Sequence, residues 1–122
     1  MRDIIRKILR EENQKQVRTF AKTINSILEQ MRTEINDEDN PEGYGSEIID
    51  HIDDIVKIEV TDVKTTEDRF IIHINTYTEG VTSYYGFEPI YSEIEWILKR
   101  QTRLKVRLKE DEIIHDKTGR NW

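Results

Sequence analysis

The sequence predicts an α+β domain, in which a long N-terminal helix and a second helix pack on a small antiparallel sheet. Two observations predict this class. Alternating apolar residues surround a short polar connection between residues 55 and 77, and apolar residues at helical spacing lie on both sides of that region. The expected order is helix, short helix, strand, strand, helix, strand. We expect a single domain over residues 1–122, with residues 1–12 forming a leader or a projecting helix.

The central region is typical of two strands joined by the polar connection Thr65-Thr66-Glu67-Asp68. Successive side chains of a strand point to opposite faces of a sheet. This alternation places Val56, Ile58 and Val60 on one face of the first strand. In the second strand it separates Phe70, Ile72 and Ile74 from Ile71, His73, Asn75 and Tyr77. A two-stranded hairpin alone is marginal in water, so the pair requires a further strand and a helix.

Residues 103–109 give the clearest alternation in the chain and predict the third strand. Leu104, Val106 and Leu108 share one face, and the other face carries Arg103, Lys105, Arg107 and Lys109. The residues from 110 to 116 either continue this strand or turn away from it.

Helical spacing extends from Asp3 to about Ile35 and again over residues 89–101, and Ser46 precedes a short helix. A single helix of 33 residues would be about 50 Å long, which is more than a domain of this size usually needs. The residues from 11 to 16 are wholly polar. We therefore expect either a break at that point or a first segment that projects from the domain.

Composition and charge limit the classes of function. The chain has no cysteine, which excludes disulfides and thiolate chemistry, and no stretch approaches the roughly 20 apolar residues of a membrane span. The net charge is −6, yet residues 34–68 hold 13 acidic and 2 basic residues, whereas residues 99–122 hold 4 acidic and 8 basic ones. We expect a cytoplasmic protein, without a cofactor, whose basic ends fold against its acidic middle or are solvated.

The opening stretch MRDIIRKILREE resembles the start of many otherwise dissimilar small proteins encoded by tailed phages, particularly phages of marine bacteria. The resemblance implies a short leader that addresses a protein to a common place, such as the inside of an assembling phage head or virion. Such leaders are cut after an apolar-X-Glu tripeptide, which Leu9-Arg10-Glu11 matches. The alternative is an ordinary amphipathic helix that packs on its own domain.

Association with a protein partner, or with itself, is the function that the sequence favours, without enzymatic activity. The candidate contact residues come from the first apolar cluster and from the aromatic loop: Ile4, Ile5, Ile8, Leu9, Tyr84, Tyr85 and Phe87. Aromatic residues beside a glycine suit an interface, although such a loop more often closes the end of a core.

The first alternative is a small nucleic-acid-binding module. Cations about 6.6 Å apart along one strand face could follow a phosphate backbone, and aromatic or imidazole rings could stack on bases. The candidate residues are Arg103, Lys105, Arg107, Lys109, His73 and Tyr77. The competing interpretation is that these cations pair with acidic residues or protect a sheet edge from aggregation.

The second alternative is a metal-dependent hydrolase. Asp50, His51 and Asp54 carry oxygen and imidazole ligands at helical spacing, so they are weak candidates for a divalent ion. The end of a helix is an unfavourable place for several carboxylates, because the helix dipole is negative there. No nucleophile with its base and no phosphate-binding glycine loop is present in the sequence.

Overall fold

The computed structural model describes residues 2–37, 44–79 and 87–116, with side chains described for residues 13–36, 44–79 and 87–115. The elements, in order, are α1 (Arg2–Asp37), α2 (Ser46–His51), the short 3-10 helix η1 (Ile52–Asp54), β1 (Ile55–Thr65), β2 (Arg69–Glu79), α3 (Glu88–Thr102) and β3 (Lys105–Asp116). This order confirms the predicted class. Tyr84 and Tyr85 lie outside the described residues, as do the side chains of Ile4, Ile5, Ile8 and Leu9.

The sheet is mixed, with strand order β1-β2-β3. β1 and β2 form the expected antiparallel hairpin, whereas β3 lies parallel to β2. The expectation of a fully antiparallel sheet was therefore wrong for the third strand. The reason is α3, because a helix between two strands returns the chain to the end at which the previous strand began, and the next strand then runs in the same direction.

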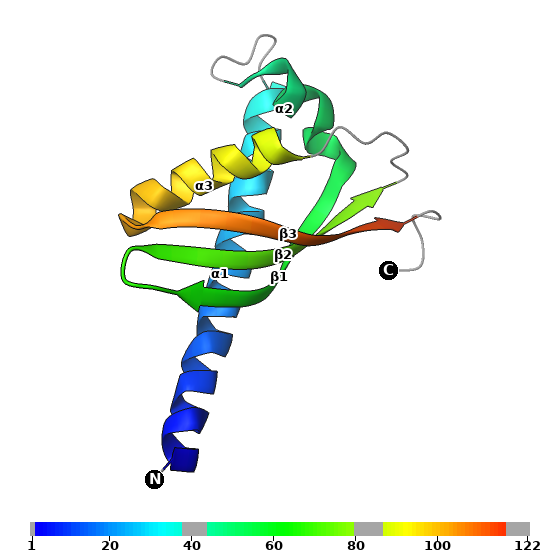
Figure 1. Cartoon of the computed structure of the whole chain (residues 1–122). Coiled ribbons are helices and arrows are strands. Elements are labelled where there is room, and N and C mark those ends of the chain that lie inside the picture. The colour runs from blue at the N-terminus through cyan, green and yellow to red at the C-terminus, as the bar shows by residue number, and fades with distance from the viewer. Residues whose placement is uncertain (1, 38–43, 80–86, 117–122) are drawn as a thin grey trace.

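Helix α1 is continuous over 36 residues, so of the two expected alternatives, a break between residues 11 and 16 or a projecting first segment, the break is absent. The helix crosses one face of the sheet, and its N-terminal turns extend past β1 (Figure 1). The apolar face of its second half supplies Ile24, Leu28 and Met31 to the core. Packing of this half, rather than local propensity in the polar stretch, accounts for the long helix.

The core lies between the sheet and the two long helices. It is closed on one side by Ile72 and Ile74 of β2 and on the other by Ile94 and Leu98 of α3, all of them at most 1% exposed. α1 and α3 both pack against this face, and among the residues that the structure describes no helix lies over the opposite face of the sheet (Figure 1).

Strand β1 departs from simple alternation at two bulges. The register with β2 skips one residue at Val56 and another at Thr61. The extra residue at Val56 places both Ile55 and Ile58 in the core, and Val56 itself is 42% exposed. The prediction that Val56 shares a face with Ile58 was therefore wrong. The predicted faces of β2 are confirmed, since Ile72 and Ile74 are buried, whereas the opposite face, with Ile71, His73, Asn75 and Tyr77, is partly exposed.

Candidate functional site

One face of the sheet has no described helix over it (Figure 1) and carries several residues that the sequence singled out, and we call it the open face. Its central residues are Ile71, His73, Asn75 and Tyr77 of β2, each partly exposed. The register of β2 with its two neighbours places one residue of β1 and one of β3 beside each of them. The open face can therefore be followed as rows of cross-strand neighbours.

The rows near the hairpin turn are basic. Lys105 lies beside Arg69, and the next row holds Arg107, Ile71 and Lys64. Lys64, Lys105 and Arg107 are exposed. These cations gather around one apolar side chain, which gives this end of the open face a local positive charge on an acidic chain.

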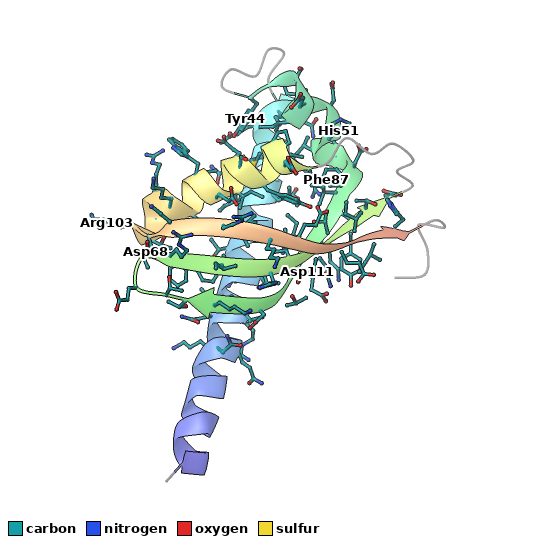
Figure 2. All side chains as sticks on the ribbon, in the orientation of Figure 1. Tyr44, His51, Asp68, Phe87, Arg103 and Asp111 are labelled. Atoms are coloured by element: carbon teal, nitrogen blue, oxygen red, sulfur yellow. The ribbon has the colours of Figure 1, made fainter. Side chains whose placement is uncertain are left out.

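Asp68, an acidic residue of the turn, lies beside these cations. Arg69 Nε is 3.5 Å from Asp68 Oδ1, and this hydrogen bond, followed by one from Thr66 and the charges of Arg69 and Lys105, holds the pKa of Asp68 below its usual value. The backbone N–H of Lys105 donates to the carbonyl of Asp68 at 3.2 Å, which fixes the turn against the start of β3. Figure 2 shows Asp68 at the same end of the sheet as Arg103.

The middle row centres on His73, which lies between Asp62 and Lys109. Its Nδ1 is 3.1 Å from Asp111 Oδ2, and its side chain is 15% exposed. Asp111 is the extra residue of a bulge in β3, where the register with β2 skips one position. The sequence offered no carboxylate adjacent to His73, and the bulge supplies one from another strand, on the open face (Figure 2).

The following row is acidic. Asn75 lies between Glu59 and Glu112, and its Nδ2 donates to Glu59 Oε1 at 3.2 Å. The hydroxyl of Tyr77 points to the same carboxylate at 3.5 Å, and Lys57 Nζ lies 4.6 Å from the Tyr77 ring centroid. Desolvation of the hydroxyl, together with the negative charge of Glu59, raises the pKa of Tyr77. The open face is therefore basic at one end and acidic toward the other.

This arrangement changes the predicted nucleic-acid site. Lys105, Arg107 and Lys109 follow one another along β3 on the open face, beside β2 and its His73. Arg103 is not a strand residue. It ends α3 in the left-handed conformation, with φ of 64°, and its N–H donates to the Lys99 carbonyl at 2.8 Å. Tyr77 lies in the acidic half of the open face, so the line of basic residues along β3 does not reach it.

The aromatic residue that the sequence placed at an exposed loop is part of the core. Phe87 is 6% exposed and packs edge-to-face on Tyr91, with ring centroids 6.4 Å apart. Because its ring is buried and packs on Tyr91 of α3, Phe87 is not available to a partner. This is the core-closing alternative that the sequence also allowed (Figure 2).

The candidate metal ligands do not converge. His51 Nδ1 is 3.2 Å from Asp54 Oδ2, whereas Asp50 is exposed and takes no part in this pair. In the parts of the chain that the structure describes, no three ligating side chains group together as a metal site would require. Within the same residues, no helix is both long and apolar enough to cross a membrane.

One exposed aromatic residue was missed by the sequence interpretation. Trp96 is 53% exposed on α3, and the Arg100 guanidinium lies 4.8 Å from its ring centroid. Its position could have been found from the sequence, because it falls on the helix side opposite Ile90, Ile94 and Leu98. An exposed tryptophan beside an arginine is typical of protein contacts.

The edge of the sheet formed by β3 borders a groove against α3. The groove is lined by Glu88, Tyr91, Ser92, Glu95, Val106, Arg107 and Leu108. Glu95 Oε2 accepts the backbone N–H of Leu108 at 2.7 Å. Beside this groove, the buried Tyr91 hydroxyl forms hydrogen bonds with Thr76 and Glu110.

Comparisons with protein-family models, with curated proteins and with solved structures find no match to this chain. The functional argument therefore depends on its own residues.

Proposed function

We propose that this chain is a non-enzymatic protein that works by association with a protein partner or with itself, using the N-terminal part of α1 and the β3 edge of the sheet. The class that we favour is a phage accessory or virion-associated component, because of the resemblance of MRDIIRKILREE to the start of small tailed-phage proteins.

The observation that carries the proposal is the course of α1. Asn13 of α1 donates its side-chain Nδ2 to the Val63 carbonyl of β1 at 2.8 Å. The helix nevertheless begins at Arg2, and its first turns extend beyond the sheet (Figure 1). Short isolated helices are marginal in water, so a helical segment with apolar residues gains stability when a partner covers it.

The test uses light scattering after size exclusion on the full chain and on a chain that begins at Glu12. We expect the full chain to form a larger assembly and the shortened chain to lose it. A double variant, Ile4→Gln with Ile8→Gln, should lose the same assembly while keeping the helix length.

The matched control is Arg6→Gln with Arg10→Gln, which has the same helical spacing in the same segment but leaves the apolar residues unchanged. We expect this control to assemble like the full chain. Equal masses for the full chain, the shortened chain and the Ile4/Ile8 variant would contradict the proposal.

A second candidate function has one specific observation in its favour. The basic rows of the open face place Arg69, Lys105 and Arg107 around Ile71, without a helix over them. Such a surface could hold a short single-stranded segment by its phosphates. The acidic row at Glu59 and Glu112 limits its length, so we rank this function below association.

A further inference from the structure

We propose that the occupant of the β3 edge is a second copy of this chain, whose β3 pairs antiparallel with the first across a two-fold axis. The two three-stranded sheets then form one continuous sheet. This inference rests on the proposed function, because it names the partner of one of the two surfaces used for association.

The two edges of the sheet differ in how they are covered. Along β1, side chains of α1 occupy the outward backbone groups: Asn13 donates to Val63, Asn25 pairs with Ile58, and Arg32 donates to Ile55. An edge covered in this way cannot add another strand.

Along β3, side chains occupy fewer of the outward backbone groups than along β1. Between Val106 and Glu110, Glu95 is the one described side chain that occupies an outward backbone group, the N–H of Leu108. β3 is 12 residues long, whereas natural edge strands are usually short because a long edge invites pairing. A partner strand could supply a carbonyl to Leu108 in place of Glu95, and pair with the groups on either side.

The order of charges along β3 favours a second copy of the chain as the partner and antiparallel pairing of the two strands. The strand begins with the basic residues Lys105, Arg107 and Lys109, and the acidic residues Glu110, Asp111 and Glu112 follow them. Antiparallel pairing of two copies can place the basic Arg107 of each strand against the acidic Glu112 of the other. Parallel pairing would place like charges opposite one another, which destabilises a sheet.

The faces of the strand agree with this pairing. Arg107 lies beside Ile71 and Glu112 lies beside Asn75, so both project from the open face although a bulge separates them. Both are exposed. A two-fold axis perpendicular to the sheet keeps the open faces of the two copies on one side, so that Arg107 of one copy can approach Glu112 of the other.

The experiment is sedimentation equilibrium at low salt on the full chain and on charge-reversed variants. Arg107→Glu alone and Glu112→Arg alone should each weaken the dimer by about ten-fold or more, because like charges then meet twice in each symmetric interface. The double variant should recover most of the loss, since it restores opposite charges in the reverse order.

Mixing the two single variants provides a sharper outcome. In a homodimer of either variant, residues 107 and 112 carry like charges and repel each other. A heterodimer of Arg107→Glu with Glu112→Arg has opposite charges at both contacts. We expect the mixture to dimerise more tightly than either variant alone. Unchanged dimerisation of the single variants, a mixture no tighter than its components, or a full chain that remains monomeric would each overturn the inference.

A cross-link tests the position of the axis independently of charge. Since the chain has no cysteine, Lys109→Cys introduces a single thiol near the junction of the two halves of β3. Two such thiols should lie close together in the antiparallel dimer and form a disulfide under mild oxidation. The control Lys64→Cys, on β1, should cross-link far more slowly, and equal rates would overturn edge pairing through β3.

These outcomes are separable from the failure of the proposed function. The tested positions on β3 are distant in sequence from Ile4 and Ile8, which test the helix. Charge variants without effect, together with an Ile4/Ile8 variant that loses assembly, would remove β3 pairing and leave association through α1 intact.

Discussion

The side-chain amide of Asn25 pairs with both backbone groups of Ile58. Asn25 Nδ2 donates to the Ile58 carbonyl at 2.7 Å, and the Ile58 N–H donates to Asn25 Oδ1 at 2.9 Å. A helix residue therefore completes the hydrogen bonding of an edge strand, in the way that another strand would. This contact fixes α1 against β1 and closes that edge of the sheet.

Replacing Asn25 with Ala should destabilise the fold by about 2 kcal/mol, because both Ile58 groups lose their partner in a partly buried place. Urea unfolding followed by circular dichroism measures the change. The control is Thr23→Ala, since Thr23 is bonded only within its own helix, at 2.8 Å to the Thr19 carbonyl. A cost for Asn25→Ala no greater than for Thr23→Ala would contradict the bridging role.

Val56 and Val60 of β1 provide a matched pair for the bulge. Val60 is 6% exposed and Val56 is 42% exposed, although simple alternation places them on one face. Val60→Thr should cost about 1 to 3 kcal/mol, because it buries a hydroxyl in the core. Val56→Thr should change the free energy of unfolding by less than about 0.5 kcal/mol. Equal costs would mean that the bulge at Val56 is absent in solution.

Tyr91 should make the fold sensitive to alkaline pH. Burial, followed by the hydrogen bond to Glu110, raises the pKa of its hydroxyl far above the ordinary value. A raised folded-state pKa gives stability that is complete below the unfolded value of about 10 and is lost as pH rises above it. Urea midpoints measured from about pH 9 to about pH 11.5 should fall for the natural chain.

The variant Tyr91→Phe separates this titration from general alkaline unfolding. It should flatten the decline above about pH 10, since the titrating hydroxyl is gone. At neutral pH it should cost about 1 to 2 kcal/mol, because the fully buried Thr76 hydroxyl loses its hydrogen-bond partner. An unchanged alkaline slope in Tyr91→Phe would assign the decline to other groups.

The basic rows of the open face predict a small effect on single-stranded oligonucleotides. Lys105→Glu with Arg107→Glu should remove any binding seen by fluorescence anisotropy at low salt, since two phosphate contacts become repulsive. The control Arg103→Glu lies outside the strand and should have a weaker effect. Binding that is unchanged in the double variant would exclude this surface as a nucleic-acid site.

Much of the fold follows from local patterns. The alternation in residues 70–77 correctly assigned the two faces of β2, because a strand paired on both sides has one buried and one partly exposed face. The helix over residues 89–101 also matches α3 closely. The parallel direction of β3 could have been expected from that helix, since parallel neighbours need such a crossover connection.

The candidate site was less accessible to sequence reasoning. The basic residues of β3 were found from their spacing, but the carboxylate beside His73 comes from Asp111, far along the chain. Phe87 was assigned to a contact loop because the composition of residues 84–87 is typical of one, but its ring is buried and packs on Tyr91 of α3. Such contacts depend on which strands become neighbours.

The sequence by itself determined where the helices and strands form, because hydrophobic spacing and turn residues act over a few neighbouring positions. Only the tertiary structure decided the rest: the bulges at Val56 and Asp111, the cover of β1 by Asn25, and the opposite charges at the two ends of the open face. Each of these depends on strand register and on packing between distant segments. A shift of one residue in register turns every side chain to the other face, so no local pattern can specify it.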